Sequence, residues 1–272
     1  ELSWLENVIP IGSGALQILN AAGDSIATLS QGIATITGVT LNGNPIFIVV
    51  GNDGSLTQVT VGGVQAVIAP AATVSATANL AVWRGTTVLI LDETTGYFSW
   101  DGATFTTISA TQVGNAIAVF QGRAWLINDR TISFTAPNTF DNFSPGDGAG
   151  STILTDEAFP GNVNAAVSAL EQLWLIGDGA IEAISNVSST GTSPNVVTTF
   201  SITNIVTNLG SNAPDSVLGY FRALAFLAPF GAYALSGVTP QKLSEKLDGL
   251  FPFLTISPTT VSAAVAVIEN LL

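Results

Sequence analysis

The sequence contains no cysteine, no histidine and no methionine, and only 6 of its 272 residues are lysine or arginine. Without cysteine no disulfide framework can form, so the sequence gives no indication of redox compartment. The absence of both cysteine and histidine excludes zinc sites built on those ligands. It also excludes any mechanism that needs a histidine base or a cysteine nucleophile.

Charge is scarce as well, because charged residues make up 9% of the chain, apolar residues make up 47%, and the net charge is −13. A chain this apolar and this poor in charge is folded, since disorder needs the opposite composition. Nucleic-acid binding needs clustered basic residues, so we expect no sequence-specific nucleic-acid partner. The acidity is compatible with a surface that repels DNA, such as the wall of a pore through which DNA slides. The alternative is that it simply keeps an apolar chain soluble.

One stretch has the length of a membrane span, residues 217–235, but its composition argues against that role. Arg222 lies inside it, and Pro229 and Gly231 interrupt it. Two short buried strands joined by a turn explain the stretch better. The start of the sequence lacks the basic and continuous apolar regions of a signal peptide. We therefore expect no membrane span.

The most informative feature is an internal repeat. Each copy has a short apolar strand, a turn, a very apolar strand, a second turn and an alternating strand. The copies are residues 34–61, 80–100, 117–136, 167–185 and 217–236. Their second turns contain Asn, Asp and Gly, as in Asn52-Asp53-Gly54 and Gly177-Asp178-Gly179, and these residues supply the positive φ of tight hairpins. The copies lie roughly 35 to 50 residues apart, which matches four-stranded propeller blades.

The middle strands, such as IFIVV and TVLIL, are continuously apolar, which favours burial between neighbouring sheets. Residues 65–69 and 104–109 are suited to a fourth, outer strand. The sequence therefore predicts an all-β fold, a β-propeller of about five to six blades in one domain spanning residues 1–272. Residues 1–32 form an N-terminal arm in this prediction, residues 33–258 the blades, and residues 259–272 the start of a further blade.

Two segments have competing interpretations. Residues 261–272, VSAAVAVIENLL, have the pattern of a first strand followed by a turn at Glu269-Asn270, with an alanine-rich helix as the alternative. On the first reading we expect the natural protein to continue past Leu272 and complete that blade. Residues 239–251 are the best helix candidate, with Thr239 as N-cap and Pro240 at the first helical position. An outer strand over residues 241–244 is the alternative there.

Four passages resemble a known family. They are WLENVIPIGSGALQIL (4–19), GRAWLINDRTISFTAPNTFDNFSPGD (122–147), LEQLWLIGDGAIEAISN (170–186) and GAYALSGVTPQKLSEKLDGLF (231–251). They resemble the propeller-fold tail-hub proteins of short-tailed double-stranded DNA bacteriophages, also called packaged-DNA stabilisation proteins. The resemblance implies a phage-tail virion component that assembles in the host cytoplasm as a homo-oligomeric ring. Such a ring lies below the portal and its adaptor, helps close the exit channel, and docks tail fibres, spikes or a needle. The family offers no catalytic residue and no cofactor.

Three arginines are candidate interface residues. Arg84, Arg123 and Arg222 lie around the turn before the second strand in three copies, and equivalent turns gather on one face of a propeller. They are therefore predicted to form a partial basic ring that pairs with acidic groups of a neighbouring subunit. Solvated turn charges are the alternative. Residues 137–160 are predicted to be a long exposed loop. Residues 186–214 are predicted to be a second long segment with a strand-like core at residues 196–202, and both segments are predicted to make the docking contacts.

Acidic residues gather in the first of these loops, at Asp141, Asp147, Asp156 and Glu157. Calcium binds such oxygens, but their spacing matches no EF-hand, and nothing places two of them at the separation a glycosidase needs. We therefore expect no metal, no cofactor and no catalytic residue, and we keep Asp141 and Asp147 as interface candidates.

The tryptophans near the apolar strands bear on the alternative functions. Trp83, Trp125 and Trp174 are predicted to lie in the core, with a sugar-binding ring as the alternative. A sugar-binding surface adhesin is accordingly the second functional hypothesis. A propeller glycoside hydrolase is the third.

Overall fold

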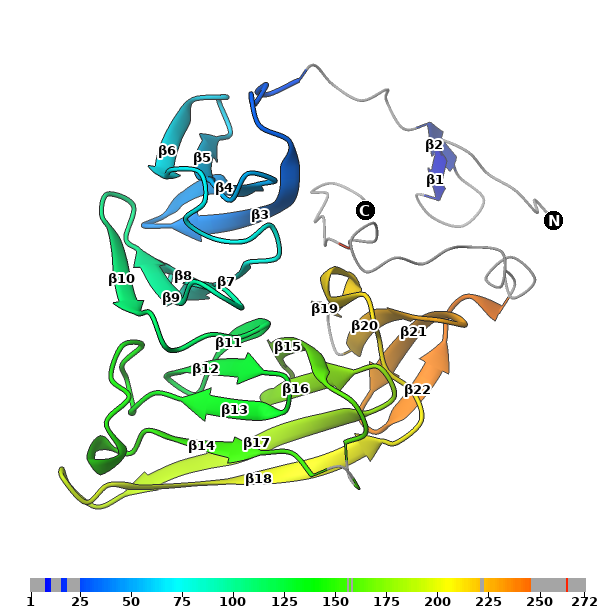
Figure 1. Ribbon diagram of the computed structural model, residues 1–272. Helices are drawn as coiled ribbons and strands as arrows, with labels where there is room; N and C mark the ends of the chain where they lie inside the picture. Colours follow the sequence, from blue (N-terminus) through cyan, green and yellow to red (C-terminus); the bar gives the residue numbers. More distant parts are fainter. Residues whose placement is uncertain are drawn as a thin grey trace.

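The computed structural model describes residues 8–10, 16–18, 25–155, 157, 159–220, 223–245 and 263. Five antiparallel four-stranded sheets follow one another in chain order around a common centre (Figure 1). In each sheet the first strand lies nearest the centre and the fourth lies at the rim. This is a five-bladed β-propeller, and the described residues contain no α-helix. The predicted fold class is confirmed, with five complete blades.

The strands are numbered in chain order. Blade 1 contains β3 (Ile33–Leu41), β4 (Asn44–Gly51), β5 (Leu56–Thr60) and β6 (Gln65–Ala69). Blade 2 contains β7 (Asn79–Trp83), β8 (Thr87–Leu91), β9 (Tyr97–Trp100) and β10 (Phe105–Ser109). Blade 3 contains β11 (Ala116–Phe120), β12 (Arg123–Asn128), β13 (Thr131–Phe134) and β14 (Gly150–Ile153). Blade 4 contains β15 (Val163–Ala169), β16 (Gln172–Gly177), β17 (Ile181–Thr190) and β18 (Val197–Val206). Blade 5 contains β19 (Leu218–Tyr220), β20 (Ala223–Ala228), β21 (Gly231–Ser236) and β22 (Thr239–Lys242).

Four short elements lie outside the blade strands. Strands β1 (Val8–Pro10) and β2 (Leu16–Ile18) pair with each other, and two single-turn 3₁₀ helices cover Pro145–Asp147 and Pro214–Ser216. Strand β6 coincides with the outer strand expected at residues 65–69, and β10 covers all but the first residue of the one expected at 104–109.

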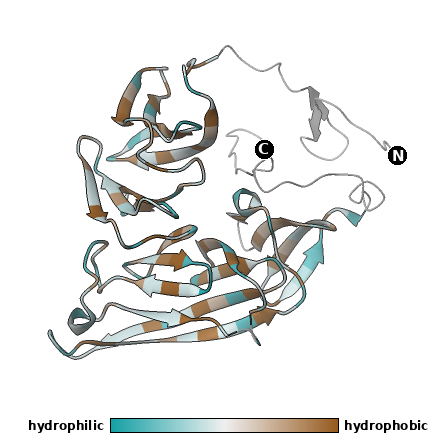
Figure 2. Cartoon of the chain, in the orientation of Figure 1, coloured by the Kyte–Doolittle hydropathy of each residue, from teal (hydrophilic) through white to brown (hydrophobic). Residues whose placement is uncertain are grey.

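The second strand of a blade explains why the sheets stack. In β8, Val88 and Ile90 belong to the hydrophobic cluster with blade 1, while Leu89 and Leu91 belong to the cluster with blade 3. Successive side chains of a strand point to opposite faces, so a continuously apolar strand serves two interfaces. Four such clusters join the five blades in series. Figure 2 shows the hydrophobic residues concentrated on the strands of the five sheets.

Blade junctions leave no room for a side chain at certain glycines. A Cβ on Gly210, which follows the end of blade 4, would overlap the carbonyl oxygen of Gly177, whereas a Cβ on Gly179 would meet no atom within 4 Å. Overpacking against backbone costs about 1–3 kcal/mol. We therefore expect Gly210→Ala to lower the urea midpoint of unfolding clearly and Gly179→Ala to leave it close to wild type. Equal midpoints for the two variants would contradict this account of the junction.

Three expectations need correction or sharpening. The helix predicted for residues 239–251 is wrong at its start, because Thr239–Lys242 form β22, which pairs with β21; residues 246–251 lie outside the described part. Residues 186–214 contain more strand than the core expected at residues 196–202, since they include the end of β17 and all of β18. Residues 137–160 contain β14 and a 3₁₀ turn, and Phe159 is fully buried.

The apolar stretch at residues 217–235 contains the short strands β19 and β20 and most of β21. Within the described part of the chain, no helix has the length and apolarity needed to cross a bilayer. The start of a further blade predicted at residues 259–272 lies outside the described residues, apart from Ala263.

Candidate functional site

The two long insertions predicted from the sequence come from neighbouring blades and pack against each other. We call the resulting feature the rim arm, defined as residues 144–149 of blade 3 and residues 186–199 of the β17–β18 hairpin. The N–H of Val196 donates to the carbonyl of Gly146 at 3.0 Å, and the Thr198 hydroxyl donates to the carbonyl of Gly148 at 2.6 Å. Figure 1 shows the hairpin extending beyond the rest of blade 4 at the lower left.

A buried arginine holds the rim arm in place. Arg123 is 1% exposed, and its Nη2 donates to the hydroxyls of Ser189 at 2.5 Å and Thr198 at 2.8 Å. Its Nη1 donates to the carbonyls of Gly148, at 2.8 Å, and Thr135. Burial lowers the pKa of this guanidinium, yet the group has four neutral oxygen acceptors to stabilise its charge. One side chain therefore connects blade 3, its insertion and both strands of the hairpin.

Aromatic packing supports the base of the arm. Phe200 of β18 lies edge-on against Trp125 of β12 and Phe134 of β13, with ring centroids 5.5 Å apart in both pairs. The Arg123 guanidinium covers the Phe134 ring with 5.5 Å between them. Packing as well as hydrogen bonds therefore fixes the arm. A segment held rigid in this way loses little conformational entropy when it binds another molecule.

Other predicted interface residues surround the blade 3 insertion. Arg84 donates to the Asn138 side-chain oxygen at 2.7 Å. Asp147 accepts a hydrogen bond from Asn142 at 3.0 Å, and this bond, together with one from Ser193 of the hairpin, lowers the pKa of Asp147. Asp147, which lies in the blade 3 part of the rim arm, therefore also contacts the hairpin part.

Asp141 lies in the same insertion, next to a buried tyrosine. The Tyr97 hydroxyl donates to the carbonyl of Phe140 at 2.9 Å. Burial raises the pKa of Tyr97 well above its usual range, and the negative charge of Asp141 raises it further. Asp141 itself is exposed.

The expectation of three equivalent turn arginines is wrong in its geometry. Arg84 is exposed in the loop between β7 and β8, at φ 50°. Arg123 begins β12, directly after the turn at Gln121 and Gly122, and it is buried. The position of Arg222 lies outside the described residues. Arg123 thus belongs to the support of the rim arm and adds no surface charge.

The residues considered for a metal site or a sugar-binding surface are not arranged for either role. No group of three acidic residues in the described part of the chain is arranged to hold a metal ion. Glu157 is exposed, and Asp156 lies outside the described residues. Trp83, Trp125 and Trp174 are at most 5% exposed, which confirms the prediction that they are core residues.

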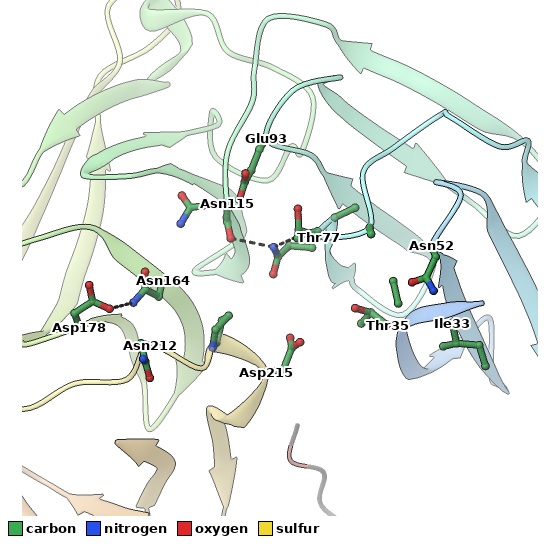
Figure 3. Close-up of a pocket in the computed structure, with 15 residues that line it drawn as sticks. Ile33, Thr35, Asn52, Thr77, Glu93, Asn115, Asn164, Asp178, Asn212 and Asp215 are labelled. Carbon is green, nitrogen blue, oxygen red and sulfur yellow. Dashed lines mark hydrogen bonds between the residues drawn. The ribbon is translucent and has the colours of Figure 1, made fainter. Parts of the chain in front are cut away.

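A second feature is a cavity of about 520 Å³ at the centre of the propeller, the axial pocket. Its lining comes from all five blades and is rich in amides and carboxylates (Figure 3). The labelled polar residues are Thr35, Asn52, Thr77, Glu93, Asn115, Asn164, Asp178, Asn212 and Asp215. Partial desolvation by the surrounding residues raises the pKa of Asp215, although its side chain stays exposed. The pocket is thus suited to a polar ligand.

Asparagines in the axial pocket connect one blade to the next. Asn79 donates through Nδ2 to the carbonyl of Asn115 at 2.9 Å, and Asn115 donates to the carbonyl of Val163 at 2.5 Å. Asn164 continues the series by donating to the carbonyl of Ser211 at 2.9 Å. Each asparagine lies at or directly beside the start of its blade's first strand. We call this series the asparagine ladder. The sequence feature that could have indicated the asparagine ladder is an Asn followed by Ala or Leu, which recurs at positions 79, 115, 164 and 212.

Comparison with known proteins identifies the fold and nothing finer. No family model and no curated protein matches the sequence. Among solved structures, PorZ, a surface component of the type-IX secretion system of Porphyromonas gingivalis, is similar over 78% of this chain, with 13% identity and a TM-score of 0.52. The chain covers 27% of that protein. Virginiamycin B lyase from Staphylococcus aureus is similar over 78% of this chain and 70% of its own, with 13% identity and a TM-score of 0.51.

Proposed function

We propose that this protein is a non-enzymatic assembly hub in which the rim arm docks a neighbouring subunit of an oligomeric ring. The resemblance noted in the sequence makes that ring a tail hub, or head–tail connector, of a short-tailed bacteriophage. There it stabilises packaged DNA and holds tail fibres, a spike or a needle. The observation that carries the proposal is the rim arm, a projection beyond the blade that a buried arginine locks in place.

The arm presents an edge on which another chain can pair. Strand β18 has ten residues and, among the described strands, pairs only with β17, so it forms the outer edge of its sheet. Val197 and Ile202 on this strand are 58% and 39% exposed, and Ile153 on β14 is 67% exposed. An extended edge with exposed apolar side chains favours β-strand addition as the docking mode.

The negative net charge of the chain also supports the tail-hub proposal. The net charge of −13 suits a surface along which DNA passes without binding, because phosphates are repelled. The same charge disfavours association of bare copies at low ionic strength. We therefore expect oligomers to form more readily as salt screens the repulsion.

The test compares two exposed valines on outer strands. Val197→Asp places a charge on the rim arm, and Val67→Asp places one on β6 of blade 1, where Val67 is 74% exposed. We expect wild type and Val67→Asp to form closed oligomers at physiological salt, and Val197→Asp to elute at the 27.8 kDa monomer mass. Size-exclusion chromatography with light scattering gives the masses. A wild-type protein that stays monomeric at every concentration and salt would contradict the proposal.

A sugar-binding adhesin is the second candidate, and the axial pocket supports it. Amide and carboxylate side chains there match the donors and acceptors of a polar ligand. Selective binding on a glycan array that disappears in Asp178→Ala would favour this function. Loss of binding without loss of stability is the required readout, because Asp178 also accepts a hydrogen bond from Asn164 at 2.7 Å.

A further inference from the structure

We propose that the axial pocket binds a small organic cation that carries two or more protonated amine groups. Glu93, Asp178 and Asp215 line the pocket, and none of its 15 described lining residues is lysine or arginine. All three acidic residues are exposed, so a ligand can reach them. This inference rests on the binding role that the second candidate function gives the pocket, and it narrows the class of ligand. It is independent of the rim arm.

The three carboxylates are spread around the pocket. Glu93 follows β8 of blade 2, Asp178 follows β16 of blade 4, and Asp215 precedes β19 of blade 5. Figure 3 shows them on different sides of the cavity. No group of three acidic side chains in the described part of the chain is placed to hold one metal ion. A single ion therefore cannot contact all three, whereas a chain of amine groups can contact them one at a time.

The asparagine ladder uses side-chain donors of the pocket wall. Asn79 donates both of its Nδ2 hydrogens to main-chain carbonyls, at 3.0 and 2.9 Å. Asn164 donates both of its own, to the Asp178 carboxylate at 2.7 Å and to the carbonyl of Ser211 at 2.9 Å. An amide side chain has only two such hydrogens, so neither of these groups can also donate to a ligand.

Unused acceptors remain on the same wall. The Oδ1 atom of Asn212 is buried and has no hydrogen-bond partner among the described atoms. Desolvation raises the pKa of Asp215, and a nearby positive charge would stabilise the ionised form of this carboxylate. An ammonium group supplies that charge together with three N–H donors and no acceptor. The wall therefore favours a ligand that is cationic and rich in donors.

The size of the cavity fits a small molecule. Its volume of about 520 Å³ lies within the roughly 300–1,000 Å³ typical of small-molecule sites. The lining comes from all five blades, so an extended ligand would contact several blades at once. An anionic ligand would be repelled by the same carboxylates. The class of ligand is therefore a linear diamine or triamine.

Calorimetric titration of spermidine, a linear triamine, into the full chain at low ionic strength tests the proposal. We expect saturable binding of one molecule per chain. Glu93→Gln and Asp215→Asn each remove one charge with little change in side-chain size, and each should weaken binding about three- to tenfold. Glu171→Gln is the matched control, because it makes the same charge change in the exposed turn between β15 and β16. It should bind spermidine as wild type does.

The remaining outcomes separate this inference from the proposed functions. Equal weakening in all three variants would show a general attraction to an acidic protein and would overturn the inference, as would the absence of saturable binding. Selective binding of a neutral glycan without binding of spermidine would overturn it and leave the sugar-binding function standing. A pocket that binds neither would contradict both, whereas the oligomer masses test the assembly hub separately.

Discussion

Replacing Arg123 with alanine is expected to destabilise the protein by at least about 3 kcal/mol, because hydrogen bonds from a charged group are worth roughly 1.5–3 kcal/mol each. The substitution would remove four such bonds and the contact with Phe134. It would also release the β17–β18 hairpin, so limited proteolysis should cut residues 186–199 before the rest of the chain.

Arg84→Ala is the matched control. Arg84 is exposed, covers the Trp83 ring at 5.0 Å and donates a hydrogen bond to Asn138. Its loss should cost less than about 1 kcal/mol. Arg123→Lys keeps the charge but loses the planar fork, so we expect an intermediate urea midpoint. If Arg123→Ala and Arg84→Ala unfold at the same urea concentration, Arg123 does not hold the arm.

Acid should destabilise the protein partly through Asp92. This carboxylate is fully buried in the turn after β8 and accepts hydrogen bonds from the N–H groups of Ser75, at 2.6 Å, and of Thr94 and Thr95. Burial by itself raises its pKa, but the hydrogen bonds from Ser75, Thr94 and Thr95 outweigh that effect and hold the pKa well below its ordinary value. A carboxylate with a lowered pKa in the folded state contributes its full stability above the unfolded pKa, about 3.9, and loses it as the pH falls further.

The expected result is a difference between two asparagine variants. Asp92→Asn puts an NH₂ group against donors and should cost about 2–4 kcal/mol at neutral pH. It should also show a shallower loss of stability than wild type below pH 4. Asp101 also caps a turn, through the N–H groups of Ala103 and Thr104, but it is exposed, so Asp101→Asn should have the smaller effect. Urea titrations between pH 2 and 7 give both readouts, and parallel pH profiles for wild type and Asp92→Asn would contradict the assignment.

The blades could be predicted because their signals are local. A continuously apolar middle strand between two turns fits only a sheet buried on both faces, and all five repeats follow this rule. The outer strand at Gln65–Ala69 was predicted to the residue, since turn residues bound it at both ends.

The secondary-structure predictions failed where pairing with distant strands, and not the local sequence, determines the structure. Thr239-Pro240 has the local chemistry of a helix start, but the same residues complete a hairpin in which Ser236 pairs with Thr239. Strand β18 has Ser or Thr at four of its ten positions, 198, 199, 201 and 203, so only the core at residues 196–202 is recognisable as a strand from the sequence. Glu182 lies in β17 and is 2% exposed, with a pKa raised by burial, which nothing in its neighbours IEA indicated.

The rim arm was the least predictable feature, because its parts are far apart in the sequence. Arg123 is separated by 66 positions from Ser189 and by 75 from Thr198. An arginine directly after a Gln-Gly turn is ordinarily a solvated residue. Arg123 is buried only because the hairpin folds back over blade 3. That arrangement produces no periodic pattern in the sequence from which it could be predicted.

Electron microscopy of the purified protein at physiological salt tests the central claim most directly. The account predicts closed rings of propellers in which the β18 edge of each copy meets its neighbour. Single five-bladed particles with an unoccupied rim arm, at every concentration, would contradict it.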